Sequence, residues 1–163
     1  MDINSNKLVF IVEDNDLYSM MLDYNLTNES IAHCLCFRTG EECVNALQEQ
    51  MNPMLIVLDY ILPGMNGRET LRKIKLLRPD VPVIILSVKK DRGLIKELFR
   101  EGAYDYLVKE KSSVKKLKKI INSFVNRIGK EQERSVNRLK VAVAFIFIAA
   151  IIVVAMYART YWM

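Results

Sequence analysis

Three carboxylates, a hydroxyl and an ammonium each follow an apolar run of this sequence, and they belong to Glu13, Asp14, Asp59, Ser87 and Lys109. Neighbouring carboxylates repel one another, and a hard divalent cation that binds their oxygens usually offsets this repulsion. Mg²⁺ is the cation that we expect. The lysine could pair with a carboxylate and then, with the hydroxyl, hold oxygens of a group attached to it. These side chains could therefore form a site at which a group is attached to one of the carboxylates.

Asp59 has the most informative surroundings. It follows the apolar run 54–58 and precedes Pro63 and Gly64, a pattern that predicts a strand buried on both faces. Ligands bind at the carboxyl edge of such strands in open α/β sheets. Taken singly, each acidic residue could begin a turn or cap a helix, Ser87 could lie in a turn and Lys109 could be a surface lysine. Their joint position after four strands favours a common site.

Five apolar runs alternate with segments of helical periodicity. We expect strands at Leu8–Val12, Cys34–Phe37, 54–59, Val81–Leu86 and Tyr104–Val108. The first helix carries apolar side chains at roughly helical spacing, namely Leu17, Met20, Met21, Tyr24 and Leu26. Alternating strands and helices predict an α/β fold, a doubly wound parallel sheet with right-handed crossovers and helices on both faces.

The C-terminal part has a different composition. Residues 141–158 contain no charge and would be about 27 Å long as a helix, enough to span a hydrocarbon core. A buried core helix is the alternative, but no polar face interrupts the run and basic residues flank it. We therefore expect a single transmembrane helix at 141–158, after a basic helical connector at 129–140 and before a short tail at 159–163.

Charge is divided unevenly along the chain. Residues 1–110 hold 13 Lys and Arg against 17 Asp and Glu, whereas residues 111–163 hold 11 against 2. Nearly all the basic residues of the second part precede the apolar run, so the positive-inside rule predicts a cytoplasmic N-terminal domain, an inner-membrane anchor and a C-terminus outside. Tyr157, Tyr161 and Trp162 would form an aromatic belt at the far interface. Cys34, Cys36 and Cys43 lack metal-ligand spacing and are expected to be reduced packing residues.

Residues 7–128 resemble the receiver domain of bacterial two-component response regulators. The resemblance rests on the segments FIVED at 10–14, VLDYILPGMNG at 57–67, VIILS at 83–87 and EGAYDYLVK at 101–109. It implies a flavodoxin-like (βα)5 sheet of strand order 2-1-3-4-5. The receiver domain would then occupy residues 1–128.

The resemblance also implies roles for individual residues. Asp59 would be the phosphoacceptor, and Mg²⁺ would be bound by Asp14, Asp59 and the backbone carbonyl of Ile61, with Glu13 acting through water. Ser87 and Lys109 would hold phosphoryl oxygens. Tyr106, three residues before the lysine, would be the aromatic side chain that changes position with Ser87 in a switch, although in a strand it can equally be an alternating residue.

Two positions depart from the family pattern. Val88 stands where the family prefers a small residue, which predicts slower phosphorylation because the phosphoryl group passes there. Glu110 replaces the frequent proline after the lysine, which removes the usual cis peptide bond. Neither change deletes a group needed for phosphoryl transfer.

These features predict a membrane-anchored, receiver-only response regulator. It would accept a phosphoryl group on Asp59 from a histidine kinase or phosphotransfer protein, with no enzymatic activity beyond Mg²⁺-dependent self-phosphorylation and autodephosphorylation. It would then signal by contacts with a membrane or cytoplasmic protein, or act as a phosphate sink. No helix-turn-helix follows residue 111, so direct nucleic-acid binding is not expected. The alternative is a membrane adaptor that is not phosphorylated and uses the receiver fold for docking.

Overall fold

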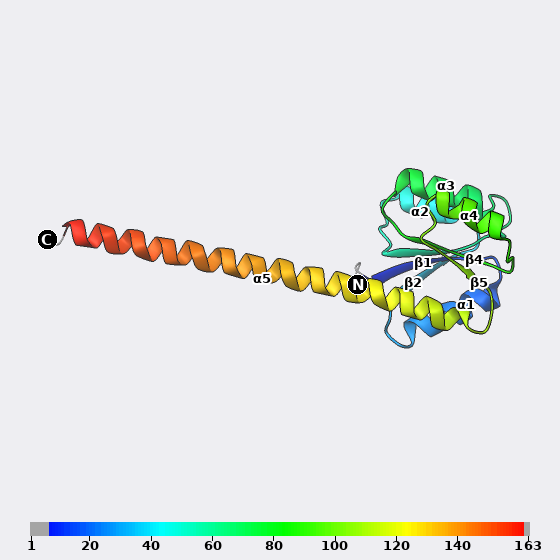
Figure 1. The fold of residues 1–163 in the computed structure, drawn as a ribbon, viewed down its shortest axis with the longest axis horizontal. Coiled ribbons are helices and arrows are strands. Elements are labelled where there is room, and N and C mark those ends of the chain that lie inside the picture. The colour runs from blue at the N-terminus through cyan, green and yellow to red at the C-terminus, as the bar shows by residue number, and fades with distance from the viewer. Residues whose placement is uncertain (1–6, 162–163) are drawn as a thin grey trace. The chain divides into compact units, whose positions relative to one another are not determined.

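The protein is described by a computed structural model covering residues 7–161, with the side chains of 132, 149, 152 and 157–161 left undescribed (Figure 1). The expected aromatic belt of Tyr157, Tyr161 and Trp162 therefore lies outside the described side chains. Helices and strands alternate in the order β1 Leu8–Val12, α1 Asp16–Thr27, β2 His33–Phe37, α2 Gly40–Gln48, β3 Leu55–Asp59, α3 Gly67–Leu77, β4 Val83–Ser87, α4 Arg92–Arg100, β5 Asp105–Val108 and α5 Ser113–Tyr161.

The five strands form one parallel sheet of order β2-β1-β3-β4-β5, which confirms the predicted flavodoxin-like fold. β1, β3 and β4 are buried along their whole length, as expected for central strands covered on both faces. β2 lies at an edge and is more exposed. The fourth strand begins at Val83 rather than at the predicted Val81, since Pro82 has no N–H to donate to a ladder.

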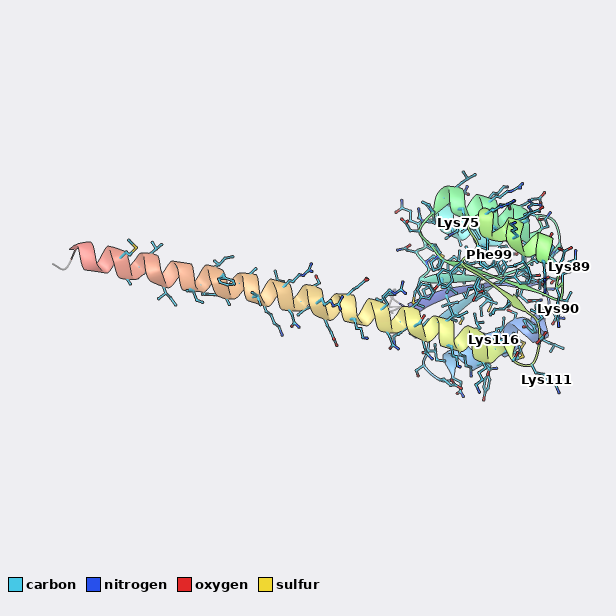
Figure 2. The ribbon with its side chains drawn as sticks, viewed as in Figure 1. Lys75, Lys89, Lys90, Phe99, Lys111 and Lys116 are labelled. Atoms are coloured by element: carbon cyan, nitrogen blue, oxygen red, sulfur yellow. The ribbon has the colours of Figure 1, made fainter. Side chains whose placement is uncertain are left out.

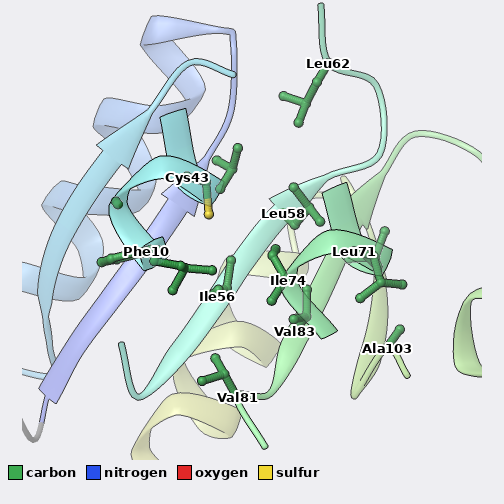
Figure 3. Packing of buried hydrophobic residues seen from close by; sticks show 14 of the residues in the cluster. Phe10, Cys43, Ile56, Leu58, Leu62, Leu71, Ile74, Val81, Val83 and Ala103 are labelled. Atoms are coloured by element: carbon green, nitrogen blue, oxygen red, sulfur yellow. The ribbon is translucent and has the colours of Figure 1, made fainter. Parts of the chain in front are cut away.

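Each face of the sheet has its own apolar core. α2, α3 and α4 cover one face, and α1 and the first turns of α5 cover the other (Figure 1). Figure 3 shows part of the first core, where Cys43 of α2 and Leu71 and Ile74 of α3 lie over Phe10 and Ile56 of the sheet. Both cores hold the strands in a fixed register, and this register sets the positions of the side chains that follow the strands.

Polar side chains begin the helices next to the carboxyl edge of the sheet. The side chain of Asn15 accepts a hydrogen bond from the Tyr18 N–H and caps α1, within the acidic and amide segment expected to do so. Asn66 caps α3 and forms a reciprocal capping box with Glu69. These caps fix where α1 and α3 start relative to the strands that precede them.

The expected apolar stripe of α1 is buried only in part. Leu26 is buried and Met21 packs against the core, whereas Leu17 is 80% exposed and Met20 and Tyr24 are also exposed. Leu22, which was not among the expected positions, is buried. Two leucines four residues apart present a continuous stripe to the sheet, and that stripe determines which face of the helix turns inward. Leu17, Met20 and Tyr24, at spacings of three and four, therefore share a face that points to solvent.

α5 is the longest element, with 49 residues. The chain divides into two compact units between Val125 and Asn126, so this helix belongs to both. In the first unit Leu117 and Ile121 are buried against the sheet. In the second unit the helix includes an 18-residue stretch long and apolar enough to cross a membrane, with its described side chains exposed.

Candidate functional site

The strand register brings the predicted residues to one edge of the sheet. Val12 is paired with Leu58, so Glu13 lies beside Asp59. Asp59 is in turn paired with Leu86, which places Ser87 one residue beyond on the neighbouring strand. Ser87 is paired with Val108, and Lys109 follows. Parallel pairing thus places side chains that are up to 96 residues apart in sequence next to one another.

Lys109 joins two of the carboxylates. Its Nζ donates to Glu13 Oε2 at 2.6 Å and to Asp59 Oδ2 at 2.7 Å, and its backbone N–H donates to the Ser87 carbonyl. All three side chains are largely buried. Burial alone would lower the pKa of Lys109, but hydrogen bonds to Asp59 and Glu13 and their charges outweigh it and raise the pKa above its ordinary value. The ammonium therefore stays charged at neutral pH.

The acidic cluster holds more negative charge than Lys109 can balance. Carboxylate oxygens of Glu13, Asp14 and Asp59 lie within 4.8 Å of one another. Burial, with a further contribution from Asp59, raises the pKa of Glu13, although the hydrogen bond from Lys109 opposes this. Asp14 is exposed, so the cluster opens to solvent on its side. Three clustered carboxylates form a donor set of the kind that hard divalent cations prefer.

The loop between β4 and α4 is tied to the same edge. The Lys89 N–H donates to Ser87 Oγ at 3.1 Å, and the Lys89 ammonium lies 5.2 Å from the centroid of the Tyr60 ring. Lys90 forms an ion pair of 2.7 Å with Glu110. Both lysines follow β4 and are labelled in Figure 2. Ser87 is fully buried, and the Lys89 N–H of this loop supplies a hydrogen-bond donor to its hydroxyl oxygen.

Tyr106 makes a contact away from the acids. Its hydroxyl donates to the Lys89 carbonyl at 2.8 Å, so the strand residue predicted as a switch is connected to the loop after Ser87. Ile61, predicted to offer a carbonyl to a cation, contributes a different group here, since its backbone N–H donates to Asp59 Oδ1 at 3.1 Å. Neither contact tests the roles predicted for these two residues.

The strand end at Asp59 leaves no space on the side of α3. A Cβ atom on Gly67 would lie 2.3 Å from the Asp59 carbonyl oxygen and 2.6 Å from Tyr60 Cα. The Gly67 N–H also donates to the Tyr60 carbonyl. A glycine is needed here because of this close approach, and the first residue of α3 thereby fixes the backbone that carries the acid.

The two departures from the family pattern directly follow two residues of this edge, Val88 after Ser87 and Glu110 after Lys109. Val88 is 62% exposed. Glu110, in the position often taken by proline, pairs with Lys90, which lowers the pKa of its carboxyl. No cis peptide bond occurs in residues 7–161, as the absence of that proline predicts.

One residue at this edge was not predicted from the sequence. The ring of Tyr18, in α1, faces the Lys109 ammonium at 4.7 Å from its centroid. No spacing in the sequence relates position 18 to position 109, and only the packing of α1 against β1 and α5 brings them together. Of the cysteines, Cys43 is buried and Cys34 partly so, while Cys36 is exposed, and all three are free.

The sheet order and the edge with its acids and lysine define a response regulator receiver domain. Residues 9–122, well over half of the chain, match the response regulator receiver domain family, and the chain belongs to that family. The family confirms the expected membership in two-component signalling. Receiver domains bind Mg²⁺ at an acidic pocket and interact with histidine kinases or phosphotransfer proteins.

The sequence is similar to longer regulators. It is 32% identical over 102 residues to the DNA-binding transcriptional regulator NtrC of Klebsiella pneumoniae, an alignment that covers 63% of this chain and 21% of that protein. It is 30% identical over 103 residues to the probable C4-dicarboxylate response regulator DctR of Bacillus subtilis, covering 63% of this chain and 45% of that protein. The chain thus spans less than half the length of these relatives.

The fold is similar to that of a solved receiver structure with metal. The Mn²⁺-bound form of response regulator Rcp1 is 29% identical, with a TM-score of 0.60, covering 72% of this chain and 90% of that one. The similarity thus covers most of that chain and about three quarters of this one.

Proposed function

We propose that this protein is a phosphorylatable receiver in which Asp59 accepts the phosphoryl group. The observation that carries the proposal is the pair of hydrogen bonds from Lys109 to Glu13 and Asp59 at the carboxyl edge of the sheet. An ammonium held there is already placed to neutralise charge that develops on a transferred group. Asp59 itself is 4% exposed, and its two oxygens accept hydrogen bonds from the Ile61 N–H and from Lys109, so its carboxylate is held in one orientation, as suits a nucleophile.

The residues at this edge fit a divalent cation. Three carboxylates within 4.8 Å of one another provide oxygen donors, and their charge exceeds that of Lys109. Asp14 and Asp59 would hold Mg²⁺ directly, with the Ile61 carbonyl and with Glu13 through water. The ion would supply positive charge for the phosphoryl oxygens. The Mn²⁺-bound form of a 29% identical regulator supports a cation at this kind of site.

The transfer requires only positioning and charge from the chain. A carboxylate oxygen of Asp59 forms a bond to phosphorus while the bond from phosphorus to the donor nitrogen of a phosphohistidine breaks, and that nitrogen keeps the electron pair. Lys109 then holds one phosphoryl oxygen. Ser87 donates its hydroxyl proton to another, since its Oγ at present accepts from Lys89 and its proton is available.

We further propose that the apolar stretch of α5 is a membrane anchor that keeps the receiver in the cytoplasm. Its length, its composition and the basic residues before it support this placement. The phosphorylated form would signal by protein contacts, or the protein would act as a phosphate sink. Tethering would raise the effective concentration for a partner in the same membrane.

Phosphorylation is tested on the full chain in detergent micelles with Mg²⁺ and a radiolabelled small phosphodonor. We expect wild type to be labelled and Asp59→Asn to remain unlabelled. Lys90→Met, which removes an exposed ion pair beside the site, is the matched control and should label like wild type. If wild type takes up neither the label nor beryllofluoride, the receiver fold serves instead as a docking module of an adaptor.

Anchoring is tested by carbonate extraction of membranes. The full chain should remain in the membrane fraction, whereas a chain that ends at Arg138 should be extracted. Equal extraction of the two proteins would contradict the anchor and leave the phosphoryl chemistry of Asp59 unaffected.

A further inference from the structure

Lys109 has a third neighbour besides its two carboxylates. The Tyr18 ring is half-buried, and its centroid lies 4.7 Å from the Lys109 Nζ. The face of an aromatic ring carries negative charge and attracts a cation, more strongly where water is excluded. The side chain of Lys109 is only 15% exposed, so this contact operates with little water around it. Tyr18, which carries no charge, thus attracts the Lys109 ammonium by a cation–π contact from α1.

The hydroxyl of the same tyrosine contacts the start of α5. Tyr18 Oη lies 3.4 Å from Ser113 Oγ, a long hydrogen bond between residues 95 apart in sequence. Ser113 is the first residue of α5, is 2% exposed, and its Oγ lies 2.6 Å from the Glu110 carbonyl. A serine hydroxyl has one proton, and a carbonyl can only accept, so this proton goes to Glu110. Tyr18 must therefore be the donor to Ser113.

We propose that Tyr18 is a positioning residue that holds the Lys109 ammonium with its ring and links it to the first turn of α5 with its hydroxyl. This inference rests on the proposed function, in which Lys109 holds a phosphoryl oxygen. Side-chain contacts connect Asp59 to Lys109, Lys109 to Tyr18, and Tyr18 to Ser113. These contacts involve α1 and the start of α5, whereas the contact of Tyr106 with Lys89 involves β5 and the loop after Ser87.

The two halves of Tyr18 can be separated by substitution. Tyr18→Phe keeps the ring over Lys109 and removes only the hydroxyl. Tyr18→Leu and Tyr18→Met remove the ring but keep an apolar side chain against α5. Tyr24 lies six residues later in α1 and is 66% exposed, so Tyr24→Leu is a matched control that removes a tyrosine from the same helix without touching the site.

The ring contact is measured without any phosphoryl group. In the full chain in micelles, with lysines labelled at the ε-carbon, the Lys109 ε-methylene protons should resonate upfield, because the Nζ next to them lies over the Tyr18 ring. Lys109→Arg assigns the signal. The upfield shift should persist in Tyr18→Phe and Tyr24→Leu and disappear in Tyr18→Leu and Tyr18→Met. An unchanged shift in both ring-deletion variants overturns the proposal, and since two variants are used, poor folding of one does not prevent the decision.

The ring and the hydroxyl of Tyr18 should affect phosphoryl labelling and the start of α5 differently. Tyr18→Leu should slow labelling by a small phosphodonor about threefold to tenfold, since the ammonium loses one of three attractions. Tyr18→Phe should label within about twofold of wild type by the same reasoning. Beryllofluoride should change hydrogen exchange of the amides at 114–118 in wild type and Tyr24→Leu but not in Tyr18→Phe. A wild-type response in Tyr18→Phe contradicts the link to α5.

Failure of this inference differs from failure of the proposed function. If wild type takes up no phosphoryl group, the proposed function fails, and the lysine signal still decides whether Tyr18 positions Lys109. If wild type is labelled but the Tyr18 variants match Tyr24→Leu in every measurement, Asp59 is the acceptor and Tyr18 has no positioning role.

Discussion

Two charge clusters in the receiver domain are built in opposite ways. At the carboxyl edge of the sheet, three carboxylates lie close together, and the two buried ones, those of Glu13 and Asp59, bind the single ammonium of Lys109. Between α3 and α4, two guanidinium groups meet two carboxylates nearer the surface, in the ion pairs Arg68–Glu97, Arg68–Glu101 and Arg72–Glu101. The first cluster is unbalanced and the second is neutral.

The pKa directions show what this difference means. In the first cluster, burial raises the pKa of Glu13, so its charged form is disfavoured. In the second, hydrogen bonds from Arg68 lower the pKa of Glu101, so its charged form is favoured. A cluster that stabilises the fold matches its charges, whereas one that leaves negative charge unmatched provides a place for a cation. The balance of charge thus distinguishes a cation-binding site from a structural ion-pair network, and no related protein is needed for that distinction.

Among the substitutions in these clusters, removal of Lys109 should change the free energy of unfolding most. Lys109→Met leaves Glu13 and Asp59 buried without their cation, and we expect the free energy of unfolding to fall by about 3 kcal/mol. Urea unfolding followed by circular dichroism measures this. Lys90→Met, which breaks an exposed pair, is the control. Equal values for the two variants would mean that the buried cluster is more hydrated than its burial indicates.

Asp59→Asn should act in the opposite direction. It removes one of the repelling carboxylates, while Lys109 keeps Glu13 as a partner, so we expect unfolding to cost about 1 kcal/mol more than in wild type. Mg²⁺ at tenfold its dissociation constant should stabilise wild type by about 1.4 kcal/mol and the variant much less. Thermal unfolding with and without Mg²⁺ tests both points. Equal stabilisation by Mg²⁺ would place the cation elsewhere.

Glu101→Gln probes the neutral cluster and its pH dependence. Losing the charge that Arg68 and Arg72 share should lower the free energy of unfolding by about 1 kcal/mol at pH 7. The pKa of Glu101 is lowered in the folded protein, so its contribution is present above the unfolded value of 4.5 and is lost as pH falls through the folded pKa. Unfolding curves of both proteins should therefore converge in acid, once Glu101 is protonated in the folded protein as well. Persistence of the difference there would assign it to packing.

Arg38→Ala should have the smallest effect. Arg38 pairs with Asp16 at 2.7 Å, but both side chains are more than 60% exposed. Such pairs contribute about 0.5 kcal/mol or less, and salt screens them. Urea unfolding at low and at high salt should show little change in either condition. If Arg38→Ala lowered the free energy of unfolding as much as Glu101→Gln does, solvent exposure would not explain why an isolated surface ion pair differs from the cluster around Glu101.

The ends of the strands could be predicted from the sequence, whereas the buried faces of the helices were harder to predict. β1 and β3 have the predicted ends at Val12 and Asp59, because five consecutive apolar residues followed by a charge favour a central strand that leaves the core. The buried face of α1 was predicted only in part, since Leu17 and Met20 have the same periodicity as the leucines that are buried. Only the sheet beneath the helix decides between two such stripes.

The same distinction holds at the site. Asp59, Ser87 and Lys109 were predicted because each is fixed by the end of its own strand. Tyr18 was not, since its contact with Lys109 depends on how α1 packs against the beginning of α5. Contacts between side chains of separate helices and loops carry no signal in a single sequence.

Gly67 has a consequence for the interpretation of natural variants. Any side chain at this position would push against the backbone of Asp59 and Tyr60, although residue 67 has no ionisable group and belongs to a helix. In a saturation mutagenesis screen that selects for phosphorylated protein, position 67 should therefore behave like a position of the acidic cluster. A screen of this kind would mark as functional a residue whose entire contribution is the space that it leaves free.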